Sequence, residues 1–127
     1  MNRRGEVLLV KSHKWKDRYT ISGGHVEVGE TLTEALKREI KEEVGLEITD
    51  VRFLMVQEAI LSEEFWEPRH FIFFDFVCRS TGGNPKPDGE EIQSYRWVKP
   101  KRALQMKLDS FTRNMVKRFL SETEARR

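Results

Sequence analysis

Residues 31–46 constrain the fold of this chain more than any other segment, because they predict a helix with both ends marked. Thr31 followed by Glu34 forms a capping box, in which each side chain bonds a backbone N–H group at the start of a helix. Apolar residues then recur at helical spacing until Gly45 supplies a C-terminal stop. These apolar residues are Leu32, Ala35, Leu36, Ile40 and Val44.

Strand-like segments flank this helix on both sides. Two β-rich runs after the helix predict a long hairpin, and Asp109 or Ser110 can cap a last helix with its core face at Phe111, Met115 and Phe119. The order of strands, helix, strands and helix favours an α+β or three-layer α/β/α arrangement. The expected strands are 6–10, 19–21, 51–61, 70–78 and 92–98, the last ended by Pro100.

Composition excludes several classes of protein. With 127 residues we expect one domain, 1–127, built on one core. The formal net charge is only +2, so no global field favours a nucleic-acid or membrane partner. Cys78 is the only cysteine, which excludes an internal disulfide and fits a reducing compartment. Because no segment has the apolar length of a membrane span, we expect a cytoplasmic protein with no membrane partner.

The first helix carries three carboxylates near its C-terminal end. Glu39, Glu42 and Glu43 are three or four positions apart, so we expect their side chains to converge on one patch opposite the apolar stripe. The negative end of the helix dipole and the mutual repulsion both disfavour this placement. A divalent cation would relieve it, and oxygen ligands point to Mg²⁺, with Mn²⁺ as a substitute. The alternative is an ordinary solvated acidic face.

The flanking residues complete a longer pattern. It reads Gly24, five residues, Glu30, seven residues, Arg38-Glu39-Ile40, one residue, Glu42-Glu43, one residue and Gly45-Leu46. The pattern resembles the Nudix box, here 24–46, at every specified position. The element order also resembles the Nudix α/β/α sandwich with a mixed central sheet, so the chain is similar to MutT-like Nudix hydrolases over nearly its whole length.

The resemblance implies roles for residues of the box and one loop. Glu39, Glu42 and Glu43 would hold the metal, with a backbone carbonyl of the glycine turn, at Gly23 or preferably Gly24. Many family members place a further carboxylate in a later loop, where Glu91 is the better candidate here and Glu90 the other. The expected catalytic set comprises Glu30, Arg38, Glu39, Glu42 and Glu43. In it Arg38 would orient the glutamates by salt bridging, with Glu30 as its partner, and Glu39 or a loop glutamate would help to deprotonate the attacking water.

The implied activity is Mg²⁺-dependent hydrolysis of a phosphoanhydride bond in a nucleoside diphosphate-linked small molecule. A nucleoside triphosphate pyrophosphohydrolase and an ADP-ribose-type pyrophosphatase both remain open. The alternatives are a Nudix-fold nucleotide-binding module without turnover and an acidic patch in an unrelated fold. The complete set of box carboxylates favours the enzyme, while a homodimer is left open.

Several residues outside the carboxylate set bear on this interpretation. Tyr19, Phe65, Trp66 and Phe73 are candidates for stacking a base, although core packing is the simpler role for them. Trp15 and the neighbouring Lys14, Lys16 and Arg18 form a basic rim. The chain departs from the family pattern in two ways. Its first strand is shorter than usual, which suggests a shortened or truncated start or an edge completed by a partner. Ser22 replaces the common proline before the double glycine, a change expected to affect loop stiffness.

Overall fold

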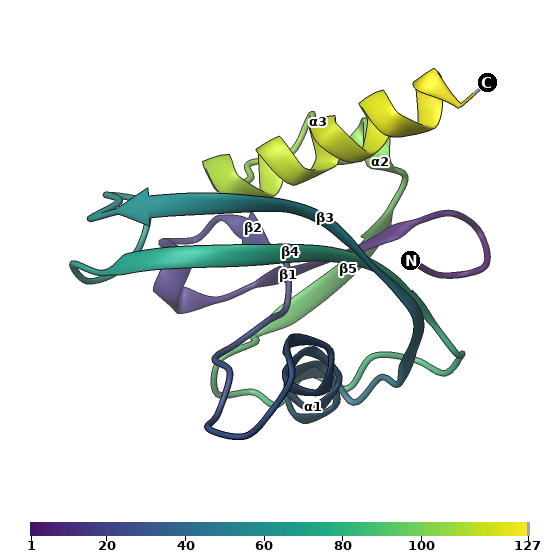
Figure 1. Ribbon diagram of the computed structural model, residues 1–127. Coiled ribbons are helices and arrows are strands. Elements are labelled where there is room, and N and C mark those ends of the chain that lie inside the picture. The colour runs from purple at the N-terminus through teal and green to yellow at the C-terminus, as the bar shows by residue number, and fades with distance from the viewer. Residues whose placement is uncertain (127) are drawn as a thin grey trace.

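The computed structural model describes residues 1–126, so the last residue of the predicted domain, 127, lies outside the described residues. Its elements follow the predicted order, with two short helices in addition (Figure 1). Before the first long helix come β1 (Val7–Lys11), the 3₁₀ helix η1 (His13–Trp15) and β2 (Tyr19–Thr20). The rest are α1 (Leu32–Val44), β3 (Ile48–Ile60), β4 (His70–Ser80), β5 (Ser94–Val98), α2 (Pro100–Ala103) and α3 (Ser110–Ala125).

The strands form two sheets between two layers of helix. One sheet has the order β2-β1-β5, and the other is the long β3–β4 hairpin. Figure 1 shows α3 above the hairpin and α1 below it, which confirms the α+β class and the α/β/α layers. A mixed central sheet was expected, but the strands in the described part of the chain pair antiparallel in both sheets. The parallel pairing found within residues 1–126 is one isolated bridge, between Tyr19 and Leu108.

Both predicted ends of α1 are confirmed. The Thr31 hydroxyl accepts a hydrogen bond from the backbone N–H of Glu34, and the Glu34 side chain accepts one from Thr31. Gly45 ends the helix in the left-handed region at φ 70°, a conformation that costs glycine little. The position of the glutamates along the helix is therefore fixed by its two caps.

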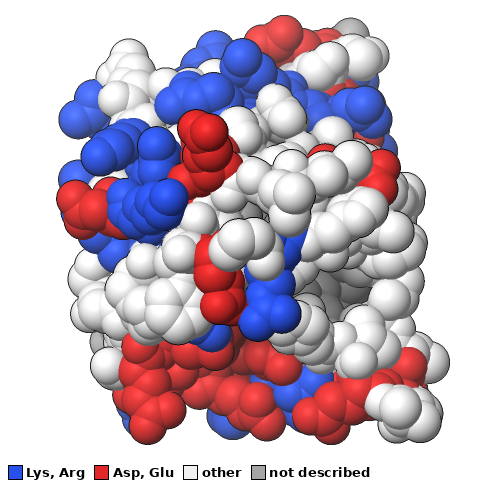
Figure 2. All heavy atoms as spheres, turned by 90° about the vertical axis from the view of Figure 1, so that its left-hand side faces the viewer, with Lys and Arg blue, Asp and Glu red and all other residues white. Residues whose placement is uncertain are grey.

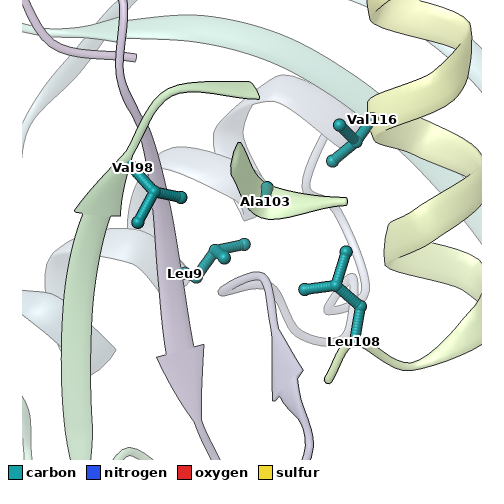
Figure 3. Close-up of a cluster of buried hydrophobic side chains, with 5 residues drawn as sticks. All are labelled: Leu9, Val98, Ala103, Leu108 and Val116. Carbon is teal, nitrogen blue, oxygen red and sulfur yellow. The ribbon is translucent and has the colours of Figure 1, made fainter. Parts of the chain in front are cut away.

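Two buried clusters hold the layers together. The first joins β1, β5, α2 and α3 through Leu9, Val98, Ala103, Leu108 and Val116 (Figure 3). The second packs the end of α1 against β1, and its members are Val10, Val44, Leu46 and Ile92. Val10 and Val44 have no exposed surface, so the C-terminal turn of α1, which carries Glu43, is anchored to the central strand β1.

The buried side of α3 differs from the prediction. Asp109 caps the helix as expected, and Met115 is buried, but Thr112 and Val116 are the other buried residues, whereas Phe111 and Phe119 are only half-buried. Thr112 is held in the interior by hydrogen bonds with Asp109 and Thr20. Hydrophobic spacing alone could not predict a buried threonine, because its burial depends on polar partners.

Candidate active site

Arg38 ties the loop before α1 to the glutamates on the helix. Its guanidinium donates to both carboxylate oxygens of Glu30, with Nε–Oε2 at 2.7 Å and Nη2–Oε1 at 2.9 Å. Nη1 reaches Glu39 at 2.7 Å and Glu42 at 3.2 Å, and Nη2 donates to the backbone carbonyl of His25 at 2.9 Å. The predicted Arg38–Glu30 pair is confirmed, and the hydrogen bond from Arg38 lowers the pKa of Glu30 to about 2.

The glycine turn lies directly against Glu39. A Cβ atom built on Gly24 would lie 2.2 Å from the carboxylate carbon of Glu39, whereas one built on Gly23 would meet nothing within 4 Å. Only a residue without a side chain lets the backbone approach this carboxylate so closely. The structure therefore brings Gly24 and Glu39 together, and the metal-binding role of the Gly24 carbonyl stays a prediction.

Glu43 points into the protein and meets Glu91. Only 5% of Glu43 is exposed. Its Oε2 accepts hydrogen bonds from the Ser22 hydroxyl and, at 3.1 Å, from the backbone N–H of Gly23. Burial raises the pKa of Glu43 to about 8; the Ser22 hydrogen bond opposes this rise, and the adjacent Glu91 carboxylate adds to it. Lys14 donates to Glu91 at 2.7 Å, and that bond, followed by the one to Glu43, lowers the pKa of Glu91.

The expected convergence of the three helix glutamates on one patch is wrong. The Glu42 side chain is 60% exposed and the Glu39 side chain 17%, while Glu43 is buried. Glu43 follows Ile40 by three positions, so it shares the inward side of the helix with the apolar stripe. Within residues 1–126, no three His, Cys, Asp or Glu side chains are grouped as a metal site. The structure instead places Glu39 and Glu42 on Arg38 and pairs Glu43 with Glu91.

The side chains nevertheless fit a hard divalent cation. Every candidate donor is a carboxylate or backbone oxygen, the type that such ions prefer. The carboxyl groups of Glu43 and Glu91 lie next to each other, and that of Glu43 is buried. A nearby cation stabilises the ionised form of such a pair. The close approach of Gly24 to Glu39 keeps side-chain atoms out of the space beside that carboxylate.

Sequence reasoning missed two partners of these carboxylates. Ser22 was expected only to change loop stiffness, and Lys14 was expected only in a basic rim. The structure places the Ser22 hydroxyl on Glu43 and the Lys14 ammonium group on Glu91. The signal in the sequence was weak: a hydroxyl residue directly before the glycine turn, and a lysine near it.

A cavity of about 770 Å³ adjoins the glutamates. Glu39, Glu43 and Glu91 form part of its wall. The aromatic side chains in its wall include Trp15, Phe65, Phe71, Phe73 and Phe111. Figure 2 shows acidic side chains gathered at the bottom of one face, in the region of α1, and a hollow above them.

The aromatic wall supports only some of the predicted stacking residues. The Trp15 and Phe65 rings meet edge to face at 4.9 Å between centroids, and Phe71 stacks on Phe73 at 5.2 Å. Phe65 and Phe73 thus remain candidates for stacking a base. Tyr19 instead packs against the core cluster of Leu9, and Trp66 packs on His13 with its ring half-exposed.

Comparison with known proteins identifies the family. A model described as the NUDIX domain matches residues 1–119. The chain belongs to the Nudix family. It is 35% identical to nucleoside triphosphatase NudI of Escherichia coli K12 over 106 residues, which cover 79% of this chain and 74% of NudI. The solution structure of the E. coli ORF135 protein matches with a TM-score of 0.74 and 25% identity, covering 98% of this chain and 86% of that one.

A longer Nudix relative shares only part of its length with this chain. The chain is 32% identical over 99 residues to NAD-capped RNA hydrolase NudC of Pectobacterium carotovorum. The match covers 76% of this chain but only 35% of NudC. Nudix proteins generally use divalent cations, in agreement with the oxygen donors described above. None of the helices within residues 1–126 has the length and apolarity needed to cross a bilayer.

If Glu39 and Glu42 hold a metal, as the family resemblance implies, Arg38→Lys is expected to lower kcat by about 10- to 100-fold, because the outer partners of metal ligands have effects of that size. A lysine ammonium cannot bond both oxygens of Glu30 and still reach Glu39 and Glu42. Arg52→Lys is the matched control. Arg52 forms an ion pair with Glu122, with 3.0 Å between nitrogen and oxygen, and this pair joins β3 to α3 and does not involve α1. Steady-state kinetics at saturating metal compare the two variants; equal activities would contradict the orienting role of Arg38.

Proposed function

We propose that this Nudix protein hydrolyses a phosphoanhydride bond in a nucleoside diphosphate-linked substrate, with Mg²⁺ as its cation and Mn²⁺ as a substitute. The observation that carries the proposal is the arrangement of the box carboxylates: Arg38 binds Glu39 and Glu42, and Glu43 lies beside Glu91. Three of these four carboxylates lie in the wall of the cavity, which is large enough for a nucleotide.

The carboxylates would hold the cation together with the Gly24 carbonyl. A bound divalent cation neutralises charge on phosphate oxygens and makes a water nucleophilic near neutral pH. Arg38 keeps Glu39 and Glu42 in place through hydrogen bonds that already exist in the protein. Glu39 or Glu91 accepts the proton of the attacking water, which then attacks phosphorus while the anhydride oxygen leaves.

The aromatic side chains would bind the base of the substrate. Phe65 and Phe73 belong to an aromatic cluster on the cavity wall, and an aromatic face stacks on any base. The basic side chain of Lys14 lies in the same wall. Its ion pair with Glu91 places positive charge beside the carboxylates, where phosphate oxygens would approach.

Nucleoside triphosphates are the first substrate class to test. The chain matches 74% of the length of the nucleoside triphosphatase NudI, which favours them. NudC is a hydrolase of NAD-capped RNA, but the chain spans only 35% of it. Dinucleotides and ADP-ribose therefore belong in the same panel, as the other open class.

The test measures phosphate, pyrophosphate and nucleoside monophosphate released from this panel with Mg²⁺, with Mn²⁺ and with EDTA. Glu42→Gln is the diagnostic variant. Glu47→Gln is its control, because Glu47 follows the end of α1 and forms an ion pair with Lys41. We expect turnover that requires the cation and is lost in Glu42→Gln only. Tight Mg²⁺-dependent nucleotide binding without turnover would overturn the proposal in favour of a binding module.

The remaining expectations are proposals of the same kind. We infer that residues 1–127 form one domain, of which the family match covers 1–119. A small-molecule nucleotide is the proposed partner. A cytoplasmic location and a homodimer stay predictions, and sedimentation of the purified protein decides the second.

A further inference from the structure

Ser22 makes a contact that the proposed function does not use. It lies in the loop after β2, directly before the glycine turn, and its hydroxyl donates to Oε2 of Glu43. The backbone N–H of Gly23 donates to the same oxygen at 3.1 Å. Both donors come from the loop and not from α1, so they fix the carboxylate from outside the helix that carries it.

Two donors on one oxygen determine which oxygen remains for a cation. A carboxylate oxygen has two lone pairs, and those of Oε2 are taken by Ser22 and Gly23. If Glu43 holds a metal, the ligating oxygen would therefore be Oε1. Glu43 is 5% exposed, so solvent water offers little to replace a lost hydroxyl.

From this geometry we infer that Ser22 is a positioning residue, whose hydroxyl orients the Glu43 carboxylate so that Oε1 faces the divalent cation. The inference rests on the proposed function, because it assumes that Glu43 is a metal ligand. Proline, common at this position in the pattern the chain resembles, has no side-chain donor. This chain thus adds a side-chain hydrogen bond to the one that the Gly23 backbone makes.

The experiment is a Mn²⁺ titration followed by electron paramagnetic resonance, without nucleotide, on the whole chain. Ser22→Ala removes the hydroxyl, and Ser22→Thr restores it. Ser110→Ala is the matched control, because the Ser110 hydroxyl donates to Glu64 at 2.6 Å in another serine–glutamate pair. Removal of an outer partner of a metal ligand costs about tenfold or more in affinity, so we expect Ser22→Ala to raise the Mn²⁺ Kd by about tenfold.

We expect Ser22→Ala to bind Mn²⁺ weakly. The Kd values of Ser22→Thr and Ser110→Ala should stay within about twofold of wild type, a much smaller change than the loss of an outer partner causes. Melting temperatures in EDTA separate positioning from folding. A purely structural role would lower the melting temperature of Ser22→Ala and leave its Kd unchanged, and that result would overturn the inference. If wild-type protein binds no Mn²⁺, the inference and the proposed function both fail. If wild type binds Mn²⁺ and Ser22→Ala binds it equally well, the inference alone fails.

Discussion

Glu43→Gln is expected to lower kcat by at least about 100-fold, the upper range for groups that hold or orient a catalytic metal. The same substitution should raise the melting temperature measured in EDTA. The two effects have one cause. Without metal, Glu43 is a buried carboxylate beside Glu91, and its ionised form is disfavoured there. An amide of the same shape never ionises, but it carries no negative charge and so binds a divalent cation more weakly than a carboxylate does. An ordinary core defect would instead lower both activity and stability.

The pH dependence of stability follows from the same side chain. The pKa of Glu43 is raised from 4.5 to about 8 by burial, so the folded protein binds this proton more tightly than the unfolded chain does. In EDTA, the contribution of Glu43 to stability is greatest below about pH 4.5 and is lost as the pH rises towards 8. The pKa of Glu91 is lowered, so its contribution is lost only at acidic pH.

Thermal denaturation between about pH 5 and 9, the range that brackets the raised pKa, measures this dependence. Wild type in EDTA should lose stability across the range, Glu43→Gln should lose less, and Mg²⁺ should restore the wild type at the alkaline end. A lower melting temperature of Glu43→Gln than of wild type at pH 8 in EDTA would contradict the account.

Gly24→Ala is the second change with a large expected effect. Its Cβ would fall 2.2 Å from the Glu39 carboxylate, so that side chain must move. A displacement of about 1 Å at a catalytic group can cost about 100-fold in rate, and we expect a loss of about that size. The folded state should tolerate the change, because the nearest obstructing atoms all belong to the flexible side chain of Glu39 and none to the backbone.

Gly23→Ala provides the matched control for this steric effect. A Cβ on Gly23 meets no atom within 4 Å, and an alanine keeps the backbone N–H that donates to Glu43. Its kcat should stay within about threefold of wild type, since surface substitutions away from strained contacts change free energies by only about 0.5 kcal/mol. Kinetics with the substrate found in the panel compare both variants; equal losses would show that the contact with Glu39 is not what Gly24 provides.

Local signals predicted both ends of α1, and the family resemblance predicted its supporting ion pair. The Thr31 capping box, the Gly45 stop and the Arg38–Glu30 pair all lie within one short stretch of chain. Helical spacing within that stretch could also have placed Glu43 on the inward side, because Glu43 follows Ile40 by one turn. The expectation of a single patch opposite the apolar stripe ignored this geometry.

Contacts between distant segments could not be predicted in the same way. Ser22 and Glu43 are 21 residues apart, and Lys14 and Glu91 are 77 apart, so only the packing of loops against α1 brings them together. Core packing was the simpler of the two roles considered for Tyr19, and its ring packs beside the core cluster that contains Leu9. The family pattern alone could suggest Glu91 as a loop carboxylate. Only the fold could show that Glu91 lies beside Glu43.

The most direct test of the account is the anomalous scattering of Mn²⁺ in a crystal of the wild-type protein. We expect a peak at about 2.0–2.4 Å from carboxylate oxygens of Glu39, Glu42 or Glu43, the range for hard divalent cations with oxygen ligands. Crystals of Glu43→Gln should lose or weaken that peak. A Mn²⁺ peak elsewhere in a protein that still hydrolyses nucleotides would contradict the assignment of these glutamates as the metal site.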